Sequence, residues 1–351
     1  MSLDELPAGL HEAEDVTRHC ALVERAAAEG RADELHALAL ALRAADPGWQ
    51  RDEVLRHVQQ ALALTPGADL AAHAVRLAAT EQNEGLVRLA AAQLASAQPL
   101  GHLLPLFEEY EQAPELFACL TQELVLRHPD IGQEGAVRRV AAHLADAHHP
   151  LAVLPPALLP FEDALDLPSY GLRGASYAIP FGPVERSGFP RRPGHRVPAA
   201  ELLAPGLLTA AVENWAEDSN GRIEARAFRL AIPAALDAEL LEGLGLACLA
   251  GEGELTMREA TPSEVMRVLF AAAATGSAYG GGRGGAYGRL LAWQSMTALA
   301  GGSRIEDAAD RTWALFDAST AWFHQVAWDL GVAALDTDRL LVHVLAATDT
   351  D

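Results

Sequence analysis

The sequence predicts a predominantly helical α+β protein, in which an array of helical hairpins precedes a domain with a small antiparallel sheet. Three observations lead to this class. Leucine, alanine and valine recur at helical spacing over residues 10–144. A stretch rich in proline and glycine follows, and beyond it helical patterns mix with short segments that alternate like strands. We therefore expect a helical domain at 1–150, a connecting segment at 151–198 and an α+β domain at 199–351.

The helical half is interrupted at regular intervals by proline and glycine. The breaks at Pro66, Pro99 and Pro129 lie 33 and 30 residues apart. Proline lacks the N–H that a helix interior needs, and each interval has room for two short helices. A period of this size is typical of stacked helical hairpins. The pattern fits a short α-solenoid, and it equally fits an irregular bundle without a true repeat.

The connecting segment is the one basic island in the chain. Between Gly171 and Pro198 it holds five glycines and five prolines, so it cannot form a single helix. Its charges are one acid, Glu185, and five arginines: Arg173, Arg186, Arg191, Arg192 and Arg196. Two interpretations remain open. The segment is a solvated loop, or it docks on the acidic surface of the same protein as a regulator.

The C-terminal domain mixes helices and strands without a strict βαβ alternation, which favours α+β over a doubly wound sheet. Ile223 to Ala227 alternate apolar and charged residues, as in a strand with one wet face. Thr261 and Glu264 form a capping box around Pro262, a strong helix start. In order, we expect a helix at 199–215 with Pro205-Gly206 as a candidate break, a strand at 223–230, a helix at 236–249 that Gly243 and Gly245 weaken, a strand at 254–259, helices at 262–274, 286–299 and 305–330, and a strand at 340–345.

Charge excludes several classes of function. The 351 residues carry 26 basic and 48 acidic side chains, a net charge of −22. Phosphate neutralisation needs clustered positive charge, so we expect neither nucleic acid nor an anionic membrane as a partner. All 26 basic residues are arginine. The absence of lysine excludes Schiff-base chemistry, a pyridoxal-phosphate anchor and a P-loop.

The sequence also predicts the compartment. Three scattered cysteines, Cys20, Cys119 and Cys248, do not make a disulfide framework or a paired metal motif. The acidic N-terminus lacks the features of a secretory signal, and no apolar run is long enough to span a membrane. We expect a cytoplasmic protein without a cofactor.

The glycine-rich segment 276–288 is the most unusual local feature. It satisfies a G-x-G-x-x-G pattern, but a helix, not a strand, is expected before it, so a Rossmann site is not indicated. Successive glycines can direct several N–H groups to one anion, and arginines can add bidentate contacts. The alternative is that the glycines permit close packing of two helices. The candidate ligand residues are Gly280, Gly282, Arg283, Gly285, Tyr287, Arg289 and Trp293.

Acidic residues supply weaker candidates. Glu108, Glu109 and Glu111 form a charged cluster that a basic partner would contact, or a merely solvated helix face. Asp349 and Asp351 are weak candidates for a metal, and the triplet that they bound is either a frayed tail or a docked anionic hook. His324 and Asp329 fall five residues apart in an expected helix, which is a poor spacing for a direct pair.

Three C-terminal stretches resemble a family of uncharacterised bacterial proteins, mainly from Streptomyces and its relatives: Gly284–Gly301, Val326–Leu335 and Leu345–Asp351. The resemblance is convincing over the last third of the chain. It implies no activity. It implies that certain residues belong to one shared site or one shared core, namely Arg289, Trp293, Asp329 and the terminal Asp-Thr-Asp.

Two functions follow as hypotheses. The first is a non-enzymatic acidic scaffold or protein-binding protein, such as an adaptor or an immunity-type inhibitor of a basic partner. It rests on the repeat-like helical half, the net charge and the failure of the catalytic templates. The second is an enzyme or sensor that binds a small anionic ligand through the glycine-rich loop. The oligomeric state is not predicted.

Overall fold

The computed structural model describes residues 2–181 and 197–350. The chain divides into two compact units, one of residues 1–157 and 169–176 and the other of residues 158–168 and 177–351. The segment that links the two halves thus contributes residues to both. Four arginines of the expected basic island, at 186, 191, 192 and 196, lie outside the described residues, as does Asp351. The predicted α+β class, with helices first and an antiparallel sheet later, is confirmed.

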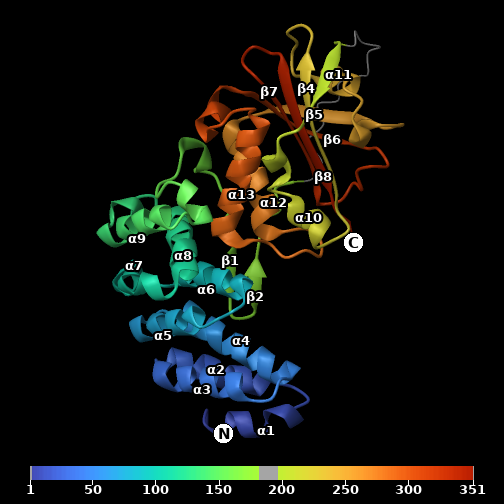
Figure 1. Cartoon of the computed structure of the whole chain (residues 1–351). Helices are drawn as coiled ribbons and strands as arrows, with labels where there is room; N and C mark the ends of the chain where they lie inside the picture. The colour runs from blue at the N-terminus through green and yellow to red at the C-terminus, as the bar shows by residue number, and fades with distance from the viewer. Residues whose placement is uncertain (1, 182–196, 351) are drawn as a thin grey trace. The chain divides into compact units, whose positions relative to one another are not determined.

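The first unit is a succession of helices (Figure 1). Its α-helices are α1 Leu6–Gly9, α2 Thr17–Ala28, α3 Ala32–Ala44, α4 Trp49–Leu64, α5 Ala68–Ala79, α6 Glu84–Ala97, α7 Leu100–Leu103, α8 Pro114–Arg127 and α9 Gly135–Asp146. The 3-10 turns are η1 Leu10–Glu12, η2 Leu104–Gln112, η3 Ile131–Gln133 and η4 Pro150–Val153. A hairpin of β1 Ser169–Gly171 and β2 Gly174–Ser176 completes the unit, with β1 against α4 and α6.

Local sequence explains where these helices begin. Pro47-Gly48 and Pro66-Gly67 directly precede α4 and α5. The side chain of Asn83 caps α6 by accepting from the N–H of Gly85 at 2.9 Å. Helices two apart in sequence also touch, α3 with α5, α4 with α6 and α6 with α8. This is the contact pattern of stacked hairpins, and the choice between a solenoid and a bundle stays a prediction.

Glu115 ties three parts of the helical unit together. It stands in the first turn of α8, 3.1 Å from Nε of Arg88 on α6 and 2.9 Å from Nε2 of His149 before η4. Burial alone would raise the pKa of Glu115, but the hydrogen bonds from His149 and Arg88 outweigh burial and lower the pKa to about 2.

The second unit is built on a six-stranded sheet in the order β3-β4-β8-β7-β6-β5, with every neighbouring pair antiparallel. The strands are β3 Ala199–Leu202, β4 Arg222–Leu230, β5 Leu255–Ala260, β6 Thr312–Ala318, β7 Asp329–Leu335 and β8 Leu341–Thr348. The helices are α10 Glu213–Glu217, α11 Ala238–Gly243, α12 Pro262–Thr275 and α13 Gly284–Leu299. The 3-10 turns are η5 Pro160–Glu162, η6 Gly206–Thr209, η7 Ala247–Leu249 and η8 Ile305–Asp310.

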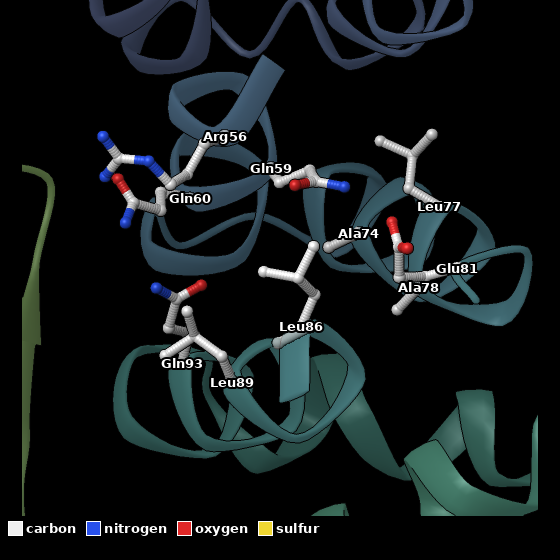
Figure 2. Close-up of a pocket in the computed structure, with 11 residues that line it drawn as sticks. Arg56, Gln59, Gln60, Ala74, Leu77, Ala78, Glu81, Leu86, Leu89 and Gln93 are labelled. Atoms are coloured by element: carbon white, nitrogen blue, oxygen red, sulfur yellow. The ribbon is translucent and has the colours of Figure 1, made fainter. Parts of the chain in front are cut away.

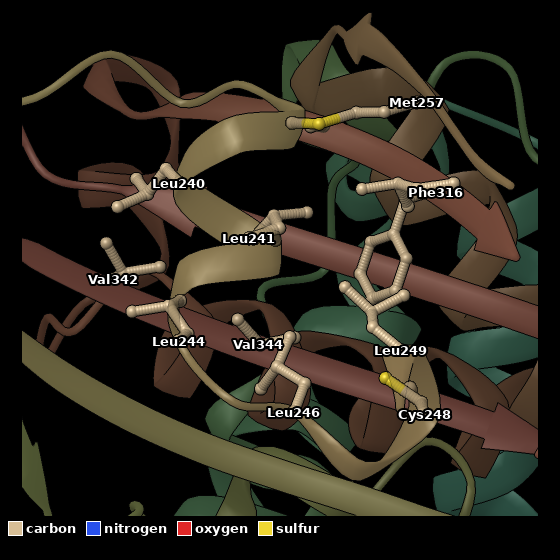
Figure 3. Close-up of a cluster of buried hydrophobic side chains, with 14 of the residues drawn as sticks. Leu240, Leu241, Leu244, Leu246, Cys248, Leu249, Met257, Phe316, Val342 and Val344 are labelled. Carbon is tan, nitrogen blue, oxygen red and sulfur yellow. The ribbon is translucent and has the colours of Figure 1, made fainter. Parts of the chain in front are cut away.

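The sheet separates two cores. Alternate residues of β8, Val342 and Val344 among them, pack with α11 and η7 on one face (Figure 3). The other alternate residues of β8 face α12 and α13. One of them is His343, whose ring lies against Gly301 just after α13. Figure 1 shows α12 and α13 side by side on this face.

Several predicted elements of the second unit are confirmed. The strand at 223–230 is β4, the strand at 254–259 is β5, and the strand at 340–345 is the start of β8. The helix that begins at Pro262 is α12. Both hydrogen bonds of its capping box, between Thr261 and Glu264, are present. The helix expected at 286–299 is α13.

The expected helix at 305–330 is wrong. The chain forms the short turn η8 and then the strand β6, and β7 begins at Asp329. Every residue of β7 is buried, and only the first residue of β6 is exposed. A strand covered on both faces loses the apolar–polar alternation, so its sequence can be mistaken for a buried helix. His324 and Asp329 therefore do not share a helix.

Two further helices are shorter than expected. At 199–215 the chain forms the edge strand β3, the turn η6 and the five-residue α10, because Pro205-Gly206 divides the segment and β3 pairs with β4. At 236–249 the helix α11 ends at Gly243, and Gly245 adopts a positive φ of 69° before η7.

Candidate functional site

The glycine-rich loop connects α12 to α13, as predicted, and several of its glycines stand where no side chain fits. A Cβ on Gly282 would lie 2.0 Å from the carbonyl oxygen of Ala274, and one on Gly280 would lie 2.6 Å from Oγ of Ser277. On α13, a Cβ on Gly288 would lie 2.7 Å from Cβ of Ala274. Gly285 is buried in the first turn of α13. These contacts support the packing interpretation of the glycines.

Protein groups already occupy three N–H donors of this loop. The N–H of Ala278 donates to Oδ2 of Asp349 at 2.9 Å, that of Gly280 to Oγ of Ser277 at 2.9 Å, and that of Arg283 to the carbonyl of Ala273 at 2.9 Å. The side chain of Asp349 is fully buried. The anion at this loop is therefore a carboxylate of the protein itself, that of Asp349.

Arg289 and Trp293 come together on Glu162. Nε of Arg289 donates to Oε1 of Glu162 at 2.7 Å and Nη2 donates to Oε2 at 2.8 Å, a bidentate pair in which both side chains are fully buried. Nε1 of Trp293 donates to the same Oε1 at 2.7 Å, and the N–H of Leu159 donates to Oε2 at 2.8 Å. A ligand anion would have to replace this carboxylate.

The remaining predicted ligand residues lie nearer the surface. Arg283 is about one-third exposed, and its Nη2 lies 3.2 Å from a carboxylate oxygen of Glu217 and 3.4 Å from one of Asp218. Tyr287 is half-buried on α13. The structure thus brings Arg289 and Trp293 to one place and pairs Arg283 elsewhere.

Buried carboxylates gather at the end of the sheet where β6 and β8 end and β7 begins. Asp329 accepts from Oγ1 of Thr348 at 2.5 Å and from the N–H groups of His324 and Val326 at 3.3 and 3.1 Å. Burial and the nearby charge of Asp329 raise the pKa of Asp317. Across residues 2–181 and 197–350, no three His, Cys, Asp or Glu side chains are grouped to hold a metal ion.

A groove between α4, α5 and α6 is a different kind of feature (Figure 2). The groove is shallow, with a cavity volume of about 30 Å³. Its floor is aliphatic, with Leu77, Leu86 and Leu89, and Leu86 is 36% exposed. The polar lining residues are Arg56, Gln59, Gln60, Glu81 and Gln93, and the lining also includes Ala74, Ala78 and Ala90.

Two of these polar side chains are buried. Gln60 on α4 is 8% exposed and Gln93 on α6 is 4% exposed. Within the described part of the chain, neither carboxamide has a hydrogen-bond partner. Figure 2 shows the Gln93 carboxamide directed from α6 toward α4. Their carboxamide atoms are not among the buried polar atoms without a partner, because they line the open groove.

A second, larger cavity of about 470 Å³ lies between the N-terminal turns and the α3–α4 connection. Its polar residues are already engaged. Nε2 of Gln50 donates to the carbonyls of His11 and Ala13, both at 3.1 Å, and Arg51 donates to the carbonyl of Ala45 at 3.4 Å. These bonds attach the N-terminal turns to the helices.

A family model covers almost the whole chain. It matches residues 17–351. The chain belongs to DUF6183, a family of unknown function. The match includes the helical unit as well as the C-terminal stretches, and it confirms the expected resemblance to an uncharacterised family. No curated protein matches the chain, and no solved structure matches it. No helix of the described residues is both long and apolar enough to cross a membrane.

The acidic cluster of this family member lies on η2. Glu108 pairs with Arg139 of α9, and Glu111 accepts from the hydroxyl of Tyr110 at 3.2 Å. Glu109 is partly exposed between them. Element η2 contacts α5, a wall of the groove.

Sequence reasoning missed two structural features. Glu162 is 127 positions from Arg289, and no local pattern marks it as a partner. The groove residues Gln60 and Gln93 come from separate helices. In the sequence, Gln60 and Gln93 were recognisable only as polar residues at helix positions where the helical pattern places apolar residues.

Proposed function

We propose that this protein is a non-enzymatic binding protein whose acidic helical unit binds a basic partner protein over the surface around the α4–α6 groove. The observation that carries the proposal is the acidic charge of this unit, together with Leu86, an exposed leucine that lines the groove. Stacked helical hairpins present extended surfaces of this kind to partner proteins.

Charge supports a basic partner. Residues 1–157 carry 23 acidic side chains and 11 arginines, a net charge of −12. Such a field accelerates encounter with a basic protein and repels nucleic acid. The η2 cluster of Glu108, Glu109 and Glu111 lies on an element beside α5, where it would meet basic residues of the partner.

The alternative function, a sensor or enzyme for a small anion at the glycine-rich loop, has less support. An incoming anion would compete with Asp349 for the loop N–H of Ala278 and with Glu162 for Arg289. A thermal-shift screen with phosphate and carboxylate compounds tests it directly. Stabilisation that disappears in Arg283→Ala would favour this alternative.

Site-specific photo-crosslinking tests the binding proposal. The crosslinker benzoylphenylalanine is placed at Leu86 in the groove and, as a matched control, at Leu40, an exposed leucine of α3 outside it. We expect one basic protein to be captured from native cells at Leu86 and not at Leu40. Capture of the same proteins at both positions, or of none at Leu86, would reject the groove as the binding surface.

A further inference from the structure

We infer that the second unit binds a monovalent metal cation, Na⁺ or K⁺, at the end of the sheet where β8 ends. The ligands are the carboxylate of Asp349 and two neutral oxygen atoms, Oδ1 of Asn214 and Oγ of Ser219. The site lies wholly within this unit, and the inference is independent of the binding function proposed for the helical unit.

Three buried oxygen atoms in this region have no hydrogen-bond partner in the described part of the chain. They are Oδ1 of Asp349, Oδ1 of Asn214 and Oγ of Ser219. The side chains of Asp349 and Asn214 are shielded from bulk water, since the two residues are 0% and 2% exposed. Buried polar atoms in proteins are nearly always hydrogen-bonded or bound to an ion or a water. Three such oxygens at one end of a sheet therefore point to a bound group.

The loop between α12 and α13 brings Asp349 and Asn214 together. Oδ2 of Asp349 accepts from the N–H of Ala278 at 2.9 Å, and Nδ2 of Asn214 donates to the carbonyl of Gly281 at 3.3 Å. The backbone between these two anchors packs on α10, because a Cβ on Gly280 would lie 3.2 Å from the carbonyl oxygen of Asn214. The two side chains thus hold the same short stretch of loop, at positions three residues apart.

Strand pairing places Ser219 in the same region. The register of β4 and β8 ends with Arg222 opposite the residue before Asp349, so the residues that precede β4 continue past the end of β8. The N–H of Gly221 donates to the carbonyl of Trp215 at 3.0 Å, which returns this segment to α10. The α10–β4 connection, the α12–α13 loop and the end of β8 therefore converge (Figure 1).

The chemistry of the unpartnered atoms favours a cation. A main-chain carbonyl only accepts, so the NH₂ of Asn214 faces Gly281 and its Oδ1 is the atom left over. An ionised carboxylate is also an acceptor only. Two acceptors cannot satisfy one another, but both can bind the same cation. Carboxylate, carbonyl and hydroxyl oxygens suit hard ions, in contrast to the thiolate and imidazole ligands of zinc and copper.

The charge of Asp349 points to a single positive charge. Within the described residues Asp349 accepts one hydrogen bond, whereas Asp329 nearby accepts three. Arg283, at the end of the same loop, pairs with Glu217 and Asp218 instead. A buried carboxylate without a counter-charge is costly. One monovalent ion makes the site neutral, and a divalent ion would leave an unbalanced positive charge.

Thermal unfolding of the full chain tests the site without a partner protein. Tm is measured in the presence of EDTA, with NaCl, KCl or choline chloride titrated at equal ionic strength. We expect one of the two metal salts to raise Tm by about 3 °C or more relative to choline chloride, and the rise to saturate. Choline controls for charge screening, and the salt with the larger effect identifies the ion.

Two variants assign the rise in Tm to the site. Asp349→Asn keeps the shape of the side chain but removes its charge, so the cation-specific rise should disappear. Asp338→Asn makes the same change at an exposed aspartate of the same unit, and the rise should remain. Crystals of the unmodified chain grown with thallous acetate give a measurement that does not depend on a variant. The anomalous scattering of Tl⁺ should place an ion beside Oδ1 of Asp349.

Four results would overturn the inference. These are equal Tm in the three salts, a cation-specific rise that persists in Asp349→Asn, crystals without Tl⁺ at Asp349, and stabilisation by CaCl₂ or MgCl₂ alone when EDTA is omitted. None of them depends on capture at Leu86, so the inference can fail while the binding function stands, and the reverse.

Discussion

Two buried polar sites, one in each unit, differ in what satisfies them. In the sheet unit, Glu162 receives donors from Arg289, Trp293 and Leu159, all within the chain. In the helical unit, Gln60 and Gln93 receive nothing from the described residues. A buried polar group costs free energy unless it is hydrogen-bonded. The first site is therefore part of the packed interior, whereas the carboxamides of the second line an open groove and are not buried without a partner.

The largest expected effect comes from breaking the internally satisfied site. Glu162→Ala leaves the guanidinium of Arg289 buried without its carboxylate, and Arg289→Ala does the reverse. Either change should lower the free energy of unfolding by about 3–5 kcal/mol. Urea denaturation measures the loss.

Arg283→Ala is the control for this prediction. Its partly exposed pairs with Glu217 and Asp218 are worth about 0–1 kcal/mol. Equal stability of the Arg283 and Arg289 variants would show that the buried Glu162–Arg289 pair does not stabilise the fold. The contrast drawn between the two units would then be wrong.

The second effect is a pH dependence that belongs to the helical unit. The pKa of Glu115 is lowered to about 2 in the folded state. Because the pKa of Glu115 is lower in the folded state, its ionised carboxylate stabilises the fold at pH values above its pKa in the unfolded chain, about 4.5. This stability is lost as pH falls from about 4.5 toward about 2. Glu115→Gln should cost on the order of 2–3 kcal/mol at neutral pH.

Urea titrations between pH 7 and pH 2.5 measure this dependence, with the helical unit followed by hydrogen exchange at α8. Glu111→Gln, on an exposed neighbour of the same unit, is the control. Parallel stability curves for wild type and Glu115→Gln would contradict the assigned role of Glu115.

The third effect tests the packing interpretation of the glycine-rich loop. In Gly282→Ala the new Cβ meets the carbonyl oxygen of Ala274, so the backbone must shift. We expect a loss of about 1–3 kcal/mol in chemical denaturation. Gly281→Ala, where nothing lies within 4 Å of the added Cβ, should change stability little. If Gly282→Ala leaves the stability unchanged, the packing interpretation is wrong and the ligand-binding interpretation of the loop is favoured.

The smallest effect has the opposite sign and sharpens the comparison. The carboxamides of Gln60 and Gln93 line an open groove, so an apolar side chain of similar shape there breaks no hydrogen bond within the described chain. Gln60→Met and Gln93→Met should therefore be neutral or stabilise by about 0–1 kcal/mol. Thermal unfolding measures this change. A clear loss of stability in both variants would mean that the glutamines serve the fold and not a partner.

Much of the fold could be predicted from local sequence. Proline and glycine breaks located the helices of the first unit, a capping box fixed the start of α12, and alternation identified β4. The loop between α12 and α13 and the burial-prone glycines within it were also visible. Of the candidate site, Arg289 and Trp293 were predicted as neighbours, but their partner was not.

What the sequence determined by itself is local: the proline and glycine breaks of the first unit, the start of α12, the acidic character and the absence of lysine chemistry. The tertiary structure decided the rest. Segments β6 and β7 are strands because neighbouring strands pair with them on both edges and helices cover both faces of the sheet, a condition that no short window contains. The Glu162–Arg289 pair and the groove of Gln60 and Gln93 likewise exist only where distant helices and turns pack together, because burial, not residue type, gives these side chains their energetic meaning.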